Sequence, residues 1–128
     1  MPLRILVVDD SAAIRQAVRS CIESNTDWEV CGQAENGSIA LEMVLELKPD
    51  VVVLDLSMPG MNGFEMAREI AASAPRTRMI MFTANDCEQL IREAQELGIS
   101  KVVAKSVDGV VHHLLAAIRE VFHERDAA

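Results

Sequence analysis

The sequence is poor in aromatic side chains, in basic charge and in long hydrophobic runs, and each shortage excludes a class of function. One tryptophan and three phenylalanines are its aromatic residues, and 20 acidic residues outnumber 12 basic ones. An acidic chain repels phosphate backbones, and few aromatic rings leave little for unpaired bases to stack on. We therefore expect no direct binding to nucleic acid.

The hydrophobic runs are too short for a membrane span, because none approaches the roughly 20 apolar residues that a transmembrane helix needs. The first four residues lead directly into an expected strand, without the pattern of a signal peptide. Cys21, Cys31 and Cys87 are widely spaced and form no C-x-x-C pair, which is typical of small side chains in a reducing compartment. The sequence thus predicts a cytoplasmic protein that does not contact a membrane.

Short apolar strands alternate with helical patterns along the whole chain. The strands are expected at about Arg4–Val8, Glu29–Ala34, Val51–Asp55, Arg78–Thr83 and Lys101–Ala104. Apolar residues at helical spacing follow each strand and predict five helices. The first begins after Ser11, an expected N-cap, and the second begins after Ser38, with Leu41, Val44 and Leu45 on its apolar face. The third begins after Asn62-Gly63, the fourth ends at Gly98, and the fifth begins at about Val107. Such alternation predicts an α/β fold, a doubly wound, flavodoxin-like sheet of five parallel strands in the order 2-1-3-4-5 with five helices.

The chain length and the absence of any linker predict one domain. About 128 residues suffice to bury a single core, and no low-complexity run divides the sequence. We therefore expect residues 1–128 to form one domain without an output module.

Polar residues come directly after four of the strands. Asp9 and Asp10 follow the first, Asp55 ends the third, Thr83 ends the fourth, and Lys105 follows the fifth. The carboxyl ends of parallel strands meet at one edge, and the strand order reverses between the first and third strands, so these groups should share a pocket. Each acid alone could simply end a strand or cap a helix, as Asp10 could before Ser11. Four matched strand ends favour a functional site.

Three carboxylates in one crevice require a cation or protons. Two unit charges about 4 Å apart repel by about 4 kcal/mol at an effective dielectric constant near 20. Lys105 supplies one positive charge, which leaves the pocket negative. A hard divalent ion matches this remainder, and we expect Mg²⁺, for which Mn²⁺ could substitute.

Four segments together resemble the response-regulator receiver domains of two-component systems, a chemotaxis-regulator-like family, over essentially the whole chain. They are Val7-Val8-Asp9-Asp10-Ser11, the segment from Val53 to Gly63, Phe82-Thr83-Ala84 and Ala104-Lys105. The Asn36-Gly37 and Thr77-Arg78 neighbourhoods and the overall spacing resemble receivers of the NarL/FixJ class.

The resemblance implies a role for each site residue. Asp55 is the expected phosphoacceptor; Asp10, Asp55 and the backbone carbonyl of Ser57 are expected to coordinate Mg²⁺, with Asp9 holding a metal-bound water. Thr83 and Lys105 are expected to contact the phosphoryl oxygens, and the small Ala84 leaves that group accessible. The expected phosphodonor is a histidine of a sensor kinase or of a phosphotransfer protein.

Three positions are expected to set the response. Val102 stands where receivers usually carry an aromatic switch residue, and a valine, stiff at χ1, has no ring to swing inward. We therefore expect the loop after Thr83 and the fourth helix to carry the conformational change. Ser57 and Asn85, which in receivers tune dephosphorylation, are not carboxylates, so a phosphorylated lifetime of minutes or longer is expected.

Three interpretations of the function stay open. The chain is a receiver that signals by docking to an output protein, and a phosphorylation-dependent homodimer is possible; or it is the regulatory domain of a helix-turn-helix transcription factor. The third is a phosphatase of the haloacid dehalogenase type, which also places an aspartate after an apolar strand. Those enzymes use a second aspartate two residues later, and Ser57 occupies that position here. The receiver, not a dedicated enzyme, is the favoured interpretation.

Overall fold

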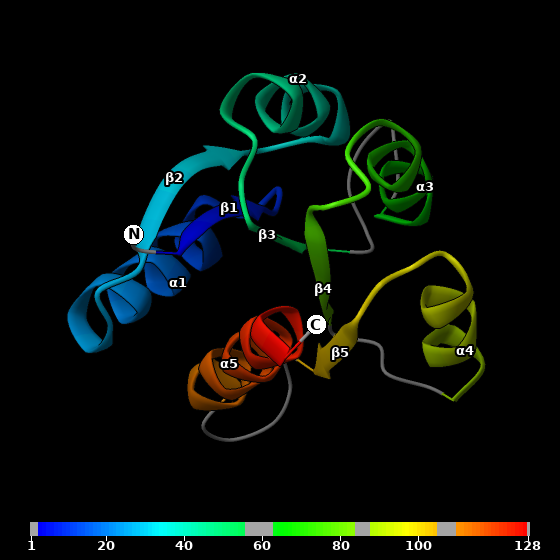
Figure 1. The fold of residues 1–128 in the computed structure, drawn as a ribbon. Helices are drawn as coiled ribbons and strands as arrows, with labels where there is room; N and C mark the ends of the chain where they lie inside the picture. Colours follow the sequence, from blue (N-terminus) through cyan, green and yellow to red (C-terminus); the bar gives the residue numbers. More distant parts are fainter. Residues whose placement is uncertain (1–2, 56–62, 84–87, 105–109, 128) are drawn as a thin grey trace.

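The computed structural model describes residues 3–55, 63–83, 88–104 and 110–127, with the backbone alone described for residues 110–112 and 122–127. Within these residues five parallel strands form one sheet in the order β2-β1-β3-β4-β5 (Figure 1). The strands are β1 Arg4–Val8, β2 Glu29–Ala34, β3 Val51–Leu54, β4 Arg78–Thr83 and β5 Lys101–Ala104. The predicted fold is confirmed, and β3 ends one residue earlier than expected.

Helices cover both faces of this sheet. They are α1 Ala12–Asn25, α2 Gly37–Leu47, α3 Gly63–Ser73, α4 Glu88–Glu96 and α5 Val110–Ala127. In Figure 1, α1 and α5 lie on one face, whereas α2, α3 and α4 lie on the other. No helix within the described part of the chain is long and apolar enough to cross a membrane.

Two hydrophobic clusters hold the helices to the sheet because side chains alternate along each strand. Ile5 and Val7 of β1 pack in the cluster with α1 and α5, whereas Leu6 and Val8 pack in the cluster with α2, α3 and α4. Every residue of β3 is buried, as expected for a central strand that is covered on both faces. The sheet is therefore packed on both faces, and its strand ends lie at the edges of this core.

Side-chain caps begin the first two helices. Ser11 is the N-cap of α1, as predicted, and its hydroxyl accepts a hydrogen bond from the Ile14 N–H at 3.3 Å. The predicted start of α2 after Ser38 is wrong, because Asn36 is the N-cap and accepts from the Ile39 N–H at 2.9 Å. An asparagine caps a helix at least as well as a serine, so α2 begins at Gly37.

The predicted apolar face of α2 is too wide. Val44 is fully buried, but its neighbour Leu45 is 52% exposed. Successive residues of a helix lie about 100° apart around its axis, so the two side chains cannot both point at the sheet.

The predicted place of Gly98 after the fourth helix is confirmed. Its φ of 91° lies in the left-handed region that glycine adopts at low cost.

Candidate functional site at the carboxyl edge of the sheet

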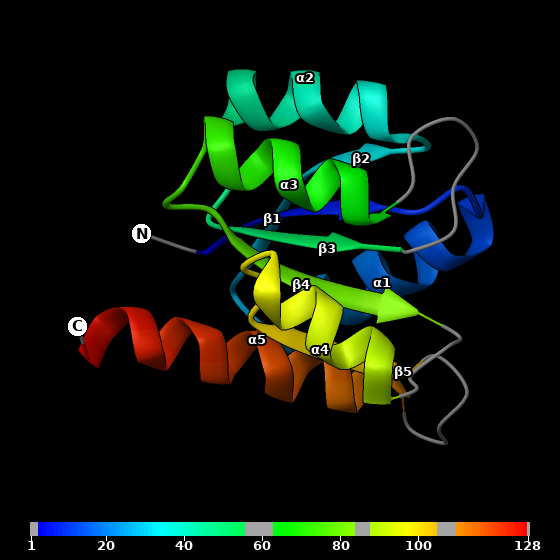
Figure 2. The ribbon, with the colours of Figure 1, turned by 90° about the vertical axis from the view of Figure 1, so that its right-hand side faces the viewer.

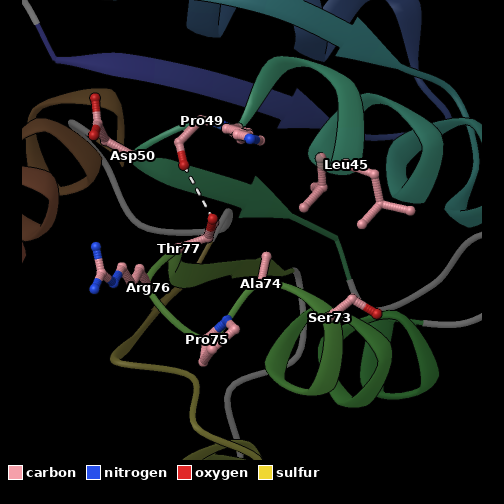
Figure 3. A pocket seen from close by; sticks show the side chains of 10 residues that line it. Leu45, Pro49, Asp50, Ser73, Ala74, Pro75, Arg76 and Thr77 are labelled. Atoms are coloured by element: carbon pink, nitrogen blue, oxygen red, sulfur yellow. Dashed lines mark hydrogen bonds between the residues drawn. The ribbon is translucent and has the colours of Figure 1, made fainter.

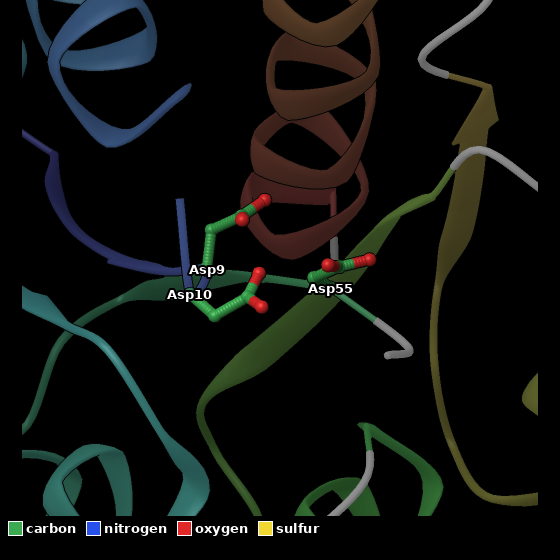
Figure 4. Close-up of side chains that lie close together, drawn as sticks. All are labelled: Asp9, Asp10 and Asp55. Atoms are coloured by element: carbon green, nitrogen blue, oxygen red, sulfur yellow. The ribbon is translucent and has the colours of Figure 1, made fainter. Parts of the chain in front are cut away.

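Asp9, Asp10 and Asp55 come together at the carboxyl edge of the sheet, as predicted. One carboxylate oxygen from each of the three lies within 4.8 Å of the others (Figure 4). In Figure 2 the arrowheads of β3 and β4 point to the right, which marks this edge. The strand order therefore converts residues 46 positions apart in the chain (9 and 55) into neighbours.

Backbone pairing sets the positions of these acids. Val8 and Leu54 are register partners of β1 and β3, so the residues that follow them lie at the same level. The Asp55 N–H then donates to the Val8 carbonyl at 3.0 Å, and the Asp9 N–H donates to the Ala34 carbonyl of β2 at 3.1 Å. Asp9 and Asp55 are thus each tied to a neighbouring strand by their own backbone N–H groups.

The three carboxylates differ in burial. Asp9 is 2% exposed and Asp55 is 7% exposed, whereas Asp10 faces solvent. An Asp9 oxygen accepts a hydrogen bond from the Ser11 N–H at 2.9 Å, which orients that carboxylate. Carboxylates this close repel one another in a partly desolvated crevice. Their oxygens are the ligands that a hard divalent cation prefers, so the donor set fits Mg²⁺ or Mn²⁺.

Arg15 is a residue of this site that the sequence analysis missed. It lies in the first turns of α1, and its Nη1 donates to the backbone carbonyl of Asp9 at 2.6 Å. The contact joins the helix to the turn that carries both Asp9 and Asp10. A cation one helical turn after Ser11 was the signal for it, but a helix surface displays many cations, and the sequence does not show which one turns inward.

Thr83 and Val102 lie on the two strands beyond β3. Thr83 is 3% exposed at the end of β4 and is the register partner of Ala104, the last residue of β5. Val102 is opposite Met81 and is packed, partly buried, against the cluster under α2, α3 and α4. The predicted switch position is therefore filled by a small, partly buried side chain that packs against the core.

Four predicted site residues, Ser57, Ala84, Asn85 and Lys105, lie outside the described residues. The structure describes the chain up to Asp55, up to Thr83 and up to Ala104, which are the residues that precede these segments.

Cys31 belongs to the packing and not to this site. It lies on β2, is half-buried, and its Sγ donates to the Ile5 carbonyl at 3.5 Å. Burial raises the pKa of the Cys31 thiol, an effect that the nearby Arg4 partly offsets. A thiol with a raised pKa stays protonated and unreactive at neutral pH.

Comparison with known proteins identifies the family. The response regulator receiver domain model matches residues 5–119. The chain belongs to this family. The receiver domain is 37% identical, over 96% of its length, to a protein-glutamate methylesterase/protein-glutamine glutaminase of Geobacter sulfurreducens, and 35% identical, over 91%, to the transcriptional regulatory protein YdfI of Bacillus subtilis. It covers 33% of the first relative and 55% of the second, so it spans a third to about half of their lengths.

A shorter relative and two solved structures complete the comparison. The chemotaxis protein CheY of Thermotoga maritima is 36% identical over 82% of this chain and 87% of CheY. The response regulator domain of Thermotoga maritima CheB superposes with a TM-score of 0.88 at 35% identity, covering 94% of this chain and 96% of that one. A LuxR-family response regulator from Aurantimonas gives a TM-score of 0.90 at 31% identity, covering 97% and 87%.

Proposed function

We propose that this receiver domain accepts a phosphoryl group on Asp55 and signals by a change of conformation. The observation that supports the proposal is the burial of Asp55 beside two further carboxylates at the carboxyl edge of the sheet. Three carboxylates within 4.8 Å of one another supply both an acceptor for the phosphoryl group and oxygen ligands for a divalent cation. The phosphodonor in this proposal is a phosphohistidine of a sensor kinase or of a phosphotransfer protein.

The chain's own groups position the transfer. A carboxylate oxygen of Asp55 attacks the phosphorus in line with the P–N bond to the donor imidazole, and the bonding pair leaves with that imidazole. Asp10, Asp55 and the Ser57 carbonyl are the proposed direct ligands of Mg²⁺, and Asp9 is the proposed acceptor for a metal-bound water. When bound, the ion supplies positive charge that offsets the charge on the phosphoryl oxygens.

Thr83 and Lys105 are the proposed contacts to the phosphoryl oxygens, with Ala84 leaving room for them. The buried Thr83 at the end of β4 is one strand away from Asp55, which supports its part. Since Val102 offers no aromatic ring, the proposed response is carried by the segment after Thr83 and by α4. Ser57 and Asn85 bear no carboxyl group, and a phosphorylated lifetime of minutes or longer is proposed on that ground.

Two alternative kinds of output are proposed for the domain. CheY, of which this chain covers 87%, supports a receiver that docks to a separate output protein. YdfI, of which it covers 55%, supports the alternative of a regulatory domain belonging to a transcription factor. In either case phosphorylation could also drive homodimer formation. Neither alternative requires direct contact with nucleic acid by this domain.

Phosphorylation with acetyl phosphate and Mg²⁺ tests the central proposal. The wild type should incorporate phosphate, Asp55→Asn should not, and Asp27→Asn, which alters an exposed acid away from the cluster, should behave as the wild type. Separation of phosphorylated from unphosphorylated protein by affinity electrophoresis measures the incorporation. Equal labelling of the wild type and Asp55→Asn would contradict the assignment, and turnover of a generic phosphate monoester would favour the dehalogenase-type phosphatase.

A further inference from the structure

A pocket of about 410 Å³ opens at the amino edge of the sheet, opposite the three acids. The carboxyl-terminal ends of α2 and α3 and the segments that enter β3 and β4 surround it (Figure 3). We call it the basal pocket and define it by Leu45, Lys48, Ala74, Pro75, Arg76 and Thr77, which line it with Val44, Pro49, Asp50 and Ser73.

Hydrogen bonds within the chain hold the walls of the basal pocket in place. The Thr77 hydroxyl donates to the Pro49 carbonyl at 3.0 Å and so joins the segments that enter β4 and β3. The Thr77 N–H donates to the Ala74 carbonyl at 3.0 Å, and Asp50 accepts from the Arg4 N–H at 2.9 Å. The pocket is therefore a formed feature of the fold, and its occupation would need little ordering of the backbone.

Leu45 leaves an apolar surface on one wall of this pocket. Its exposed fraction is 52%, and within the described part of the chain it is the one large hydrophobic residue that is exposed. A single exposed leucine is ordinary, but this one borders a hollow that Ala74 and Pro75 also line. An apolar side chain that entered the hollow would be covered on more than one side.

Lys48 and Arg76 give the same pocket a positive charge. Both lie on its rim, and neither forms an ion pair with a residue that the structure describes. Asp50, the acid among the lining residues, already accepts from the Arg4 backbone. The lining residues therefore carry two positive charges against one negative charge, a local positive excess on a chain of net charge −8. They match a ligand that carries carboxylates.

We propose that the basal pocket docks an acidic segment of a partner protein, with an apolar side chain against Leu45 and carboxylates near Lys48 and Arg76. A second copy of this chain is a poorer occupant, because a symmetric contact would place Lys48 and Arg76 of one molecule against the same two cations of the other. The surface lies at the opposite edge of the sheet from Asp55, so the docking does not require phosphorylation. It provides a place to hold a partner while the carboxyl edge carries the signal.

Peptide titration of the full chain tests the proposal. The probes are the N-acetylated, C-amidated peptides Glu-Glu-Leu-Glu-Glu and Lys-Lys-Leu-Lys-Lys, followed by backbone amide shifts in two-dimensional ¹⁵N–¹H NMR. The acidic peptide should shift the amides of Leu45, Lys48 and Thr77 with a dissociation constant of about a millimolar, as expected for a small contact. The basic peptide should not. Absence of these shifts at millimolar acidic peptide, or equal shifts with both peptides, would overturn the proposal.

Substitutions in the pocket separate this site from general charge attraction. Lys48→Gln, Arg76→Gln and Leu45→Gln should each weaken binding of the acidic peptide by about three- to tenfold. Arg19→Gln removes an exposed cation of α1 and should leave binding unchanged. Equal weakening by Arg19→Gln would overturn the assignment to the pocket. Concentration-dependent shifts of the same amides without peptide would assign the surface to a second copy instead.

Discussion

The two edges of the sheet differ in local charge and are built from different parts of the chain. At the carboxyl edge, three acids within 4.8 Å of one another follow the two central strands β1 and β3. At the amino edge, Lys48 and Arg76 precede β3 and β4 and face a pocket. The acids repel one another at close range, and a bound cation would relieve this repulsion. The bases are set apart around a hollow, which leaves them open to a larger partner.

Removal of one acid should have the largest effect on this contrast. In the wild type, Mg²⁺ at a hundredfold excess over its dissociation constant should raise the free energy of unfolding by about 2.7 kcal/mol by mass action. Asp10→Ala should abolish most of this gain, measured as the Mg²⁺-dependent rise in Tm. Arg76→Gln, at the other edge, should keep it. A rise that survives in Asp10→Ala would place the metal elsewhere.

Arg15 offers a sharper test of the carboxyl edge, because geometry and charge predict opposite outcomes. If its hydrogen bond to the Asp9 carbonyl positions the acids, Arg15→Gln should weaken Mg²⁺ binding by about three- to tenfold, in keeping with the roughly 0.5–1.5 kcal/mol that a typical hydrogen bond contributes. Calorimetric titration with Mg²⁺ measures the change.

Two variants control for the Arg15 result. Arg19→Gln breaks an exposed pair with Glu23 on the same helix and should have no effect. Arg15→Lys, which keeps the positive charge but lacks the planar guanidinium, should have a Mg²⁺ affinity between those of Arg15→Gln and the wild type. Tighter Mg²⁺ binding by Arg15→Gln would show that the positive charge of Arg15, which repels the cation, affects Mg²⁺ affinity more than its hydrogen bond does.

The smallest expected effect concerns the amino edge. Lys48 caps α2 with a φ of 49°, a left-handed conformation that costs a residue with a Cβ about 1–2 kcal/mol. Lys48→Gly should therefore stabilise the fold by about 0.5–1 kcal/mol after the entropy of glycine is counted, as measured by urea denaturation. The same variant should lose affinity for the acidic peptide. Destabilisation by Lys48→Gly would mean that the lysine side chain contributes more to the fold than its backbone costs.

Much of the fold and part of the site could be predicted because they depend on local pattern. The predicted bounds of β1, β2, β4 and β5 were correct, and so was the Ser11 cap. Strand bounds and helix caps depend mainly on residues that are close together in the sequence. The cluster of Asp9, Asp10 and Asp55 followed from the parallel order of the strands. The roles of Ser57, Ala84, Asn85 and Lys105 remain predictions.

Other features could not be predicted, because they depend on which way a side chain turns. Asn36, not Ser38, caps α2, and both residue types are good caps, so the sequence alone did not separate them. Leu45 continues the apolar pattern of α2 yet faces solvent. Arg15 resembles Arg19, the other cation of α1, until its contact with the Asp9 carbonyl is seen.

The sequence by itself determined the alternation of strands and helices, the strand ends at which the acids stand and the family. These depend on residue type and spacing over short stretches of chain. Only the tertiary structure decided that Arg15 reaches the turn of the acids and that Lys48 and Arg76, 28 positions apart in the chain, line one pocket with Leu45. The physical reason is that the pocket depends on how α2 and α3 pack beside each other on the sheet, and the Arg15 contact depends on which way that side chain turns, and no local pattern of residue types determines either.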